Sequence, residues 1–255
     1  MKPMSGKSSA SVNKINIFRE AGDLFKGAAQ YLADQIQLAL FSRERVSLML
    51  SGGSTPRDVY AHLASPELGG RIDWSRVQVF WSDERCVPPD HAESNFAMAQ
   101  QNLLEKISIP AQNIHRIRGE LSPQEAAAGY EQTLVAMLGA SAVDLLLLGM
   151  GEDGHIASLF PGSPALVETQ RWVVPVPHDQ PPPPLVWRVT VTFPLILAAR
   201  QVIMIVSGGK KSARLRQALY EQAGEAPLPV QKLREVEGEL VWLVDRAAVD
   251  SAEQA

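Results

Sequence analysis

A histidine in a glycine-rich segment is the strongest candidate for catalysis in this chain. His155 follows Asp153 and Gly154, shortly after the apolar run at residues 143–148. A side chain just past the end of a buried strand is held rigidly at the edge of a sheet. Histidine is the usual general base near neutral pH, because its ordinary pKa lies close to the operating pH. The alternative is a structural histidine, and sequence position alone does not separate the two.

Three cations are candidates for binding an anion near that histidine. Arg85 ends the charged triplet at residues 83–85, and Lys210 and Lys211 follow S-G-G. An arginine binds phosphate through its planar fork, whereas a lysine supplies a point charge. Lysines at the start of a predicted helix oppose the helix dipole, which favours a ligand-binding role. The triplet is either a solvated rim or an ion-paired frame that holds Arg85 towards a pocket.

Four unusual loops follow four apolar runs. They read S-G-G-S-T-P-R, S-D-E-R-C-V-P-P-D-H, G-M-G-E-D-G-H-I-A-S-L-F-P-G and S-G-G-K-K-S. In an open parallel sheet, the loops at the carboxyl ends of the strands converge on one edge, where ligands bind. Two of the four are rich in glycine and hydroxyl groups and lead into helices, so their amides can face an anion. Turn chemistry explains one such loop, but four at strand ends favour a binding site.

Several other chemistries are not expected. The glycines at 149–154 have the G-x-G-x-x-G spacing, but they lack the helix and the later acidic residue of a dinucleotide site. Neither glycine-rich loop has Walker spacing. With no H-x-x-x-H pair and no cysteine cluster, we expect no metal. Ser51, Ser54 and Cys86 have no recognisable triad around them, so we expect no covalent nucleophile.

Short apolar runs alternate with helical patterns along the chain. Residues 46–50, 77–81, 143–148, 201–206 and 240–244 are predicted strands. Between them, residues 95–106, 123–138 and 211–222 are predicted helices, as is a long helix whose apolar residues recur every four positions from Leu24 to Leu40. Strands that are apolar on both faces and separated by helices predict an α/β fold, with a parallel sheet covered on both sides.

Residues 171–192 depart from this alternation of apolar runs and helical patterns. They contain Pro175, Pro177 and the run of prolines at 181–184, followed by R-V-T-V-T. Proline cannot donate a ladder hydrogen bond, so this segment predicts an edge or loop excursion followed by one half-exposed strand. We expect a small β-rich insert within one domain.

Composition limits the partners. The 255 residues include 24 Lys+Arg and 28 Asp+Glu, a net charge of −4, and 45% are hydrophobic. This balance, with no long basic run, argues against nucleic acid or an anionic membrane as partner. No run reaches the about 18 apolar residues of a membrane span, and a single cysteine excludes an internal disulfide framework. We expect a cytoplasmic protein, with residues 1–12 as a loose tail and residues 13–255 as a single domain.

Long stretches of the chain resemble one family. L-S-G-G-S-T-P, W-S-D-E-R-C-V-P-P-D-H-A-E-S-N, G-M-G-E-D-G-H-I-A-S-L-F-P-G and R-V-T-V-T-F-P-L-I-L-A-A-R look like the 6-phosphogluconolactonase family, in family order. The resemblance implies a Rossmann-like α/β fold, shared with glucosamine-6-phosphate deaminases and ribose-5-phosphate isomerases. It also implies hydrolysis of 6-phospho-D-glucono-1,5-lactone to 6-phosphogluconate, a step of the oxidative pentose phosphate pathway, without metal or other cofactor. The implied partner is a small sugar-phosphate lactone, and the expected assembly is a monomer or small homo-oligomer.

The resemblance also implies roles for matching residues. His155 is expected to activate water for attack on the lactone carbonyl, and Asp153 to orient that imidazole or bind substrate hydroxyls. Arg85 and Lys211 resemble the phosphate-binding pair, and Lys211 matches the family pattern better than Lys210. The other implied substrate contacts are Gly52, Gly53, Ser54, His91 and Asn95.

Two rival functions remain. One is an aldose–ketose isomerase or amino-sugar phosphate deaminase on the same fold. The deaminase shares the G-S-T-P and D-G-H loops, but it typically has D-E-Y where this chain has D-E-R, and F-N-E-P where this chain has S-L-F-P. Both differences favour the lactonase. A non-catalytic sugar-phosphate binder is the other rival, and the intact D-G-H argues against it because a pure binder needs no base.

Overall fold

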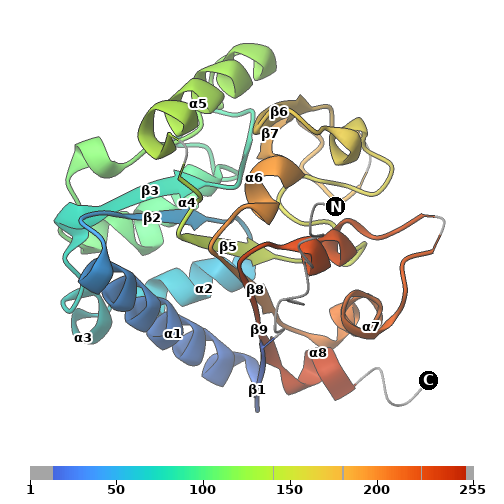
Figure 1. The fold of residues 1–255 in the computed structure, drawn as a ribbon, viewed down its shortest axis with the longest axis horizontal. Helices are drawn as coiled ribbons and strands as arrows, with labels where there is room; N and C mark the ends of the chain where they lie inside the picture. Colours follow the sequence, from blue (N-terminus) through green and yellow to red (C-terminus); the bar gives the residue numbers. More distant parts are fainter. Residues whose placement is uncertain (1–13, 140, 180, 225, 251–255) are drawn as a thin grey trace, which may run out of the picture.

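The main element of the fold is a six-stranded parallel sheet (Figure 1). The computed structural model describes residues 14–139, 141–179, 181–224 and 226–250, so the predicted tail at 1–12 lies outside the described residues. The strand order is β1-β9-β8-β5-β2-β3, and every neighbouring pair is parallel. The strands are β1 (Lys14–Phe18), β2 (Val46–Leu50), β3 (Val77–Trp81), β5 (Leu145–Gly149), β8 (Gln201–Val206) and β9 (Glu239–Asp245).

The five predicted strands of this sheet are confirmed, with shifts of one or two residues at β5 and β9. The sixth, β1, was not predicted. It lies at the edge of the sheet and pairs only with β9, and all of its residues are exposed or half-buried. An edge strand that buries little apolar surface leaves no continuous hydrophobic run in the sequence.

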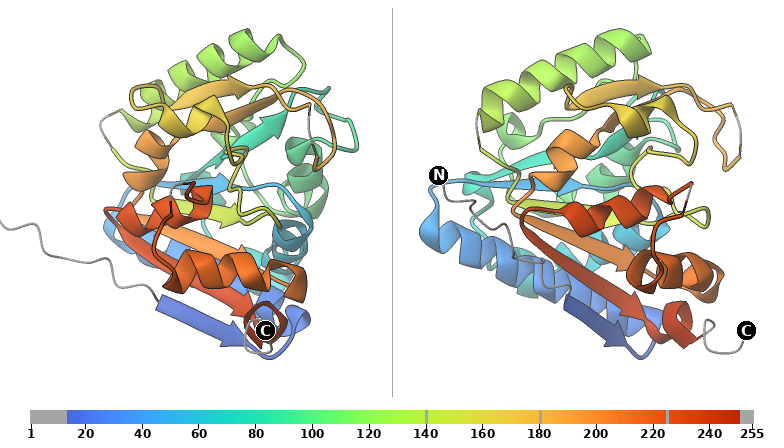
Figure 2. Two further views of the ribbon diagram at one scale, coloured as in Figure 1. Left: turned by 90° about the vertical axis from the view of Figure 1, so that its right-hand side faces the viewer. Right: turned by 45° about the vertical axis from the view of Figure 1, so that its right-hand side comes forward.

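Helices cover both faces of the sheet, as predicted. Figures 1 and 2 show α1 (Ala21–Ser42), α2 (Ser54–Leu63) and α3 (Pro66–Gly69) along one face and α6 (Phe193–Leu197) on the other. The long helix α5 (Pro123–Leu138) packs instead against the strands at residues 173–176 and 188–191. The predicted apolar face of α1 is confirmed, since Leu24, Ala28, Leu32, Ile36 and Leu40 are buried. The remaining α-helices are α4 (Asn95–Asn102), α7 (Ser212–Tyr220) and α8 (Arg246–Asp250).

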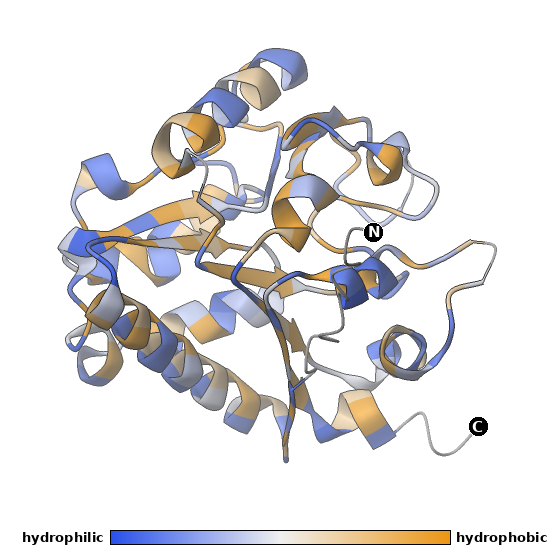
Figure 3. Ribbon diagram, in the orientation of Figure 1, coloured by the Kyte–Doolittle hydropathy of each residue, from blue (hydrophilic) through white to orange (hydrophobic). Residues whose placement is uncertain are grey.

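The core follows from this layering. The inner strands of the large sheet are mostly apolar, whereas α1 shows apolar and polar bands (Figure 3). In β2, β3 and β8 every residue is buried. Because both faces of the sheet are covered, only its two ends are left for polar chemistry.

The expected β-rich insert is a three-stranded antiparallel sheet with the order β4-β7-β6. Its strands are β4 (Asp83–Arg85), β6 (Val173–Val176) and β7 (Arg188–Val191). Pro175 lies in β6, an edge strand, as predicted. The prediction that R-V-T-V-T is half-exposed was wrong, because β7 is the central strand and all four of its residues are buried. Of its two polar residues, Arg188 lines a cavity and Thr190 accepts a hydrogen bond from the backbone N–H of Ser158.

The segment at residues 83–85 also differs from both interpretations offered above. It forms β4, in which Asp83 and Glu84 are buried, so it is not a solvated rim. Glu84 is not an ion-pair partner that holds Arg85. Its carboxylate instead accepts the backbone N–H groups of Arg85, Asn95 and Phe96 and the hydroxyl of Ser94. Burial raises the pKa of Glu84, and these hydrogen bonds oppose that rise. Glu84 therefore anchors the start of α4.

Candidate active site

The four unusual loops meet at one cavity. They follow β2, β3, β5 and β8, which are consecutive in the large sheet, so their carboxyl ends lie side by side. The cavity has a volume of about 230 Å³. Seven of the nine predicted site residues line it, namely Gly52, Gly53, Ser54, Arg85, Asn95, His155 and Lys211. Asp153 and His91 are not among the lining residues.

His155 and Asp153 form a hydrogen-bonded pair at the cavity. Nδ1 of His155 lies 2.6 Å from Oδ1 of Asp153, and the backbone N–H of His155 donates to the same oxygen at 3.1 Å. Burial alone would raise the pKa of Asp153, but the hydrogen bonds and charge of His155 outweigh it and lower the pKa. An ionised Asp153 keeps the proton on Nδ1 and leaves Nε2 as the basic nitrogen.

Gly151 makes this pair possible. A Cβ at position 151 would lie 2.2 Å from the His155 ring and 2.6 Å from Oδ1 of Asp153. Any side chain there would displace the imidazole. The glycine spacing of this loop therefore serves the histidine, which gives a physical reason for the G-M-G-E-D-G-H pattern.

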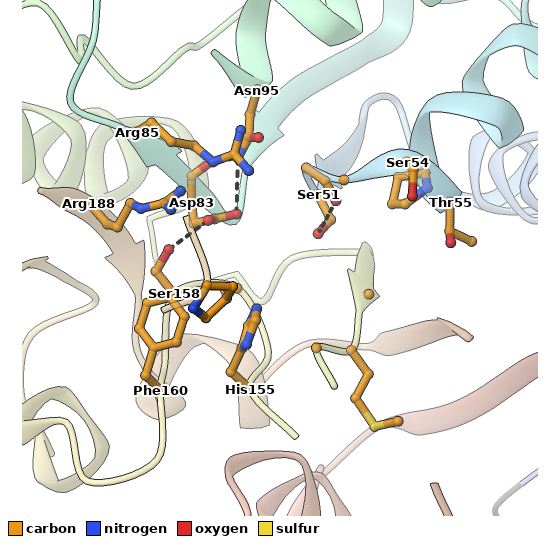
Figure 4. A pocket seen from close by; sticks show the side chains of 18 of the residues that line it. Ser51, Ser54, Thr55, Asp83, Arg85, Asn95, His155, Ser158, Phe160 and Arg188 are labelled. Carbon is orange, nitrogen blue, oxygen red and sulfur yellow. Dashed lines mark hydrogen bonds between the residues drawn. The ribbon is translucent and has the colours of Figure 1, made fainter. Parts of the chain in front are cut away.

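The first glycine-rich loop brings the N-terminus of α2 to the cavity (Figure 4). Gly53 precedes the helix with φ +104°, a conformation that favours glycine. A Cβ at Gly52 would lie 2.0 Å from Oδ1 of Asn95, so the loop packs directly against Asn95. The amides at the start of α2 thus face the cavity and suit a negative charge.

Asp83, Asn95 and Ser158 form a buried polar network in the cavity wall. Ser158 Oγ donates to Oδ2 of Asp83 at 2.7 Å, and Nδ2 of Asn95 donates to Oδ1 at 3.3 Å (Figure 4). Asn95 also donates to the backbone oxygen of Asp83 at 2.9 Å, while its own Oδ1 is buried without a partner among the described residues. An unpaired amide oxygen is a natural acceptor for a ligand hydroxyl.

Three cations line the cavity. Arg85 and Lys211 were predicted, and Arg188, at the start of β7, was not. Lys210 is exposed and Lys211 is half-buried, and of the two only Lys211 lines the cavity. Burial lowers the pKa of Lys211, although Glu152 and Asp245 act in the opposite direction.

The proline-rich segment supplies one wall. Pro182 and Pro183 line the cavity, and the His178 ring contacts the Pro182 carbonyl oxygen through Nε2 at 2.6 Å. Phe160 stacks on His178 with the ring centroids 4.2 Å apart, and its other neighbour is His155 at 4.7 Å. A continuous row of rings thus joins the wall to the candidate base.

His91 is not brought to the cavity. It is exposed, and its Nδ1 accepts the backbone N–H of Glu93 at 3.1 Å. It shapes the loop that precedes α4.

Sequence reasoning also missed functional residues. Arg188, Ser158 and Phe160 line the cavity without having been singled out, and Asp83 had been considered only as part of the charged triplet. The alternation in R-V-T-V-T carried a usable signal, because residues two apart on a strand share a face. Thr190, on the same face as Arg188, accepts the backbone N–H of Ser158 at 3.1 Å.

Within the described residues, no three or more His, Cys, Asp or Glu side chains gather in a way that could bind a metal ion. None of the helices in the described part of the chain has the length and apolar character needed to cross a bilayer.

Comparisons with known proteins show the family of this chain. The sequence model of the glucosamine-6-phosphate isomerases/6-phosphogluconolactonase family matches residues 19–242. A probable chloroplastic 6-phosphogluconolactonase 3 of rice (Oryza sativa subsp. indica) is 38% identical over 245 residues, covering 91% of this chain and 74% of the relative. The 6-phosphogluconolactonase of Nostoc sp. is 35% identical over 240 residues, covering 92% of this chain and 96% of the relative. The solved structure of the Trypanosoma brucei 6-phosphogluconolactonase superposes with a TM-score of 0.84 at 28% identity, covering 96% of this chain and 100% of that one. The chain therefore belongs to the glucosamine-6-phosphate isomerase/6-phosphogluconolactonase family.

Proposed function

We propose that this protein is a 6-phosphogluconolactonase, which hydrolyses 6-phospho-D-glucono-1,5-lactone to 6-phosphogluconate. The observation that carries the proposal is the Asp153–His155 pair, 2.6 Å apart, at a cavity that Arg85 and Lys211 also line. A base, an anion site and a set of helix N-terminal amides are the groups that hydrolysis of a phosphorylated lactone requires. His91 lies outside the cavity and has no part in this proposal.

His155 acts twice in the reaction. Nε2 first takes a proton from water, whose oxygen attacks the lactone carbonyl carbon, C1. The tetrahedral intermediate then collapses, the bond from C1 to the ring oxygen breaks, and that oxygen takes the proton from Nε2. The new carboxylic acid ionises and releases one proton to solvent. Asp153 stabilises the imidazolium between the two steps.

The cations and amides position the substrate and stabilise charge. Arg85 and Lys211 hold the phosphate, so that the lactone carbonyl is presented to the base. The amides of Gly52, Gly53 and Ser54 face the oxyanion that forms at C1. One such donor contributes roughly 3 kcal/mol in acyl transfer. A lactone is an activated ester, so no covalent nucleophile is needed.

The test is the rate of lactone hydrolysis at neutral pH with a chelator present, followed by proton release after subtraction of spontaneous hydrolysis. Acceleration that survives the chelator supports the proposal. His155→Ala is expected to lower kcat by about 10²–10⁴-fold while 6-phosphogluconate still binds. His62→Ala is the control, because His62 lies on α2 but does not line the cavity.

Two outcomes would contradict the proposal at different levels. Full activity of His155→Ala would exclude the mechanism but not the reaction. No acceleration by the folded wild-type protein would exclude the reaction, and ammonia release from glucosamine 6-phosphate would then identify a deaminase.

A further inference from the structure

Arg188 and Arg85 lie directly opposite one another on neighbouring strands. They are register partners in the antiparallel pair of β4 and β7, so their side chains leave the same face of the small sheet. Both line the cavity, and Figure 4 shows both guanidinium groups pointing towards its centre. Like charges at directly opposite positions are destabilising. The pairing therefore needs a compensating negative charge.

Arg188 has few direct partners in the protein. It is 4% exposed, and among the described residues its side chain makes one hydrogen bond, from Nη2 to the Pro184 carbonyl oxygen at 2.9 Å. Its Nε is buried without a partner, and no ion pair joins it to a described carboxylate. Burial lowers the pKa of Arg188 and the charge of Arg85 lowers it further, whereas the charges of Asp83, Glu84 and Glu93 raise it.

The neighbouring carboxylates are already engaged. Asp83 accepts hydrogen bonds from Ser158 and Asn95, and Glu84 accepts those at the start of α4. Glu93 lies 3.9 Å from Nη1 of Arg85, but its side chain is 48% exposed and it has no ion pair with Arg188. These carboxylates act on Arg188 through space but form no ion pair with it, so its buried Nε is left without a partner among the described residues, which is costly.

We propose that Arg85 and Arg188 form a two-arginine clamp for the phosphate group of the substrate. Two guanidinium forks side by side match the several oxygens of a phosphate dianion, and the dianion removes the repulsion between them. Lys211 adds a third cation from the loop after β8. This inference rests on the proposed function, and it adds Arg188 to the substrate-binding residues. The competing role for Arg188 is structural, because its bond to Pro184 also holds the proline wall.

The experiment compares two lactones that differ only in the phosphate. For Arg188→Gln, KM for the phosphorylated lactone and Kd for 6-phosphogluconate are expected to rise by about 10- to 100-fold, because a charge-assisted contact is lost. The value of kcat/KM for unphosphorylated glucono-1,5-lactone is expected to stay within about twofold. Arg188→Lys keeps the charge but loses the fork. Its KM for the phosphorylated lactone and its Kd for 6-phosphogluconate are expected to lie between those of wild type and Arg188→Gln.

Controls separate folding from binding. Arg234 is the matched control, since it also donates to backbone carbonyl oxygens, those of Gln217 and Ala218, but does not line the cavity. Arg234→Gln is expected to leave the discrimination between the two lactones unchanged. Melting curves with and without inorganic phosphate give a second readout, in which phosphate stabilises wild type but not Arg188→Gln.

A loss of activity that is equal on both lactones in Arg188→Gln and Arg188→Lys would overturn the clamp and leave Arg188 as a support of the wall. Failure of the proposed function is a separate result. In that case wild type does not accelerate lactone hydrolysis, while stabilisation by inorganic phosphate still depends on Arg188.

Discussion

Asp153 holds His155 through two hydrogen bonds to a single oxygen. Oδ1 accepts the ring Nδ1–H at 2.6 Å and the backbone N–H of the same histidine at 3.1 Å. Two contacts from one atom fix both the position of the ring and its tautomer, so that Nε2 is the nitrogen available to water.

Asp153→Asn tests this arrangement. The amide NH₂ of asparagine can donate to Nδ1, which would place the proton on Nε2 and remove the base. We expect kcat to fall by about 10²–10⁴-fold with little change in KM. Steady-state kinetics on the phosphorylated lactone measure both values. An unchanged kcat would show that the tautomer is set by something other than Asp153.

The lowered pKa of Lys211 predicts how the affinity for 6-phosphogluconate changes at alkaline pH. Burial lowers its pKa from the ordinary lysine value, so it loses its charge at a lower pH than an exposed lysine. A bound phosphate favours the charged form, so binding takes up a proton and weakens as pH rises through the lowered pKa. Calorimetry with 6-phosphogluconate, from about pH 7 to pH 10, measures this.

Lys211→Arg is the informative variant for that experiment. Arginine keeps its charge across this range, so the alkaline loss of affinity is expected to move to higher pH. Lys210→Arg is the control, because Lys210 is exposed and does not line the cavity. The same alkaline profile in Lys211→Arg and wild type would remove Lys211 from the phosphate site.

Tyr60 connects stability to the geometry of the first glycine-rich loop. Its hydroxyl accepts the backbone N–H of Ser51 at 2.9 Å and donates to the Ser51 carbonyl oxygen at 2.8 Å. Tyr60→Phe leaves both buried backbone groups without this partner, at a cost of about 1–3 kcal/mol. We expect a lower melting temperature and a lower kcat/KM, since Gly52 and Gly53 follow directly. Tyr220→Phe, at an exposed tyrosine, serves as control, and an unaltered kcat/KM in Tyr60→Phe would mean that the loop holds its shape without the hydroxyl.

Asp144 allows the stability of the fold to be tested separately from catalysis. It precedes β5 at the end of the sheet opposite the cavity, and its Oδ2 accepts the N–H of Ser47 at 2.9 Å and the Ser47 hydroxyl at 3.0 Å. Its Oδ1 lies 3.3 Å from Nε of Arg43 and 3.4 Å from Nε of Arg200. Asp144→Ala is expected to lower the free energy of unfolding by about 3 kcal/mol.

Denaturant unfolding measures that loss, and kcat/KM below the melting transition is expected to stay at the wild-type value. Asp34→Ala removes an exposed pair with Arg71 and is expected to cost less than about 1 kcal/mol. A large loss of activity in folded Asp144→Ala would show that the two ends of the sheet are coupled.

Much of the fold and of the site followed from local patterns. The apolar runs at β2, β3 and β8 mark buried parallel strands because both faces of such strands are covered. The loops after these strands and after β5 converge because consecutive strands of a parallel sheet present their carboxyl ends at one edge. Seven of the nine predicted site residues line the cavity for this reason.

What sequence patterns did not determine depends on contacts between distant segments. β4 and β7 pair across more than a hundred residues, as in Asp83 with Thr190 and Arg85 with Arg188. No local signal in D-E-R reveals a strand, because it is short and its polar side chains are buried only when β7 lies beside it. The position of His91 outside the cavity likewise depends on the folded loop between β4 and α4, in which its Nδ1 accepts the backbone N–H of Glu93. Short-range patterns therefore determined five strands of the large sheet, the main helices and the position of the candidate base. Only the tertiary pairing of β4 with β7 decided that Arg188 lies beside Arg85 in the wall of the cavity, because the two residues are far apart in the sequence.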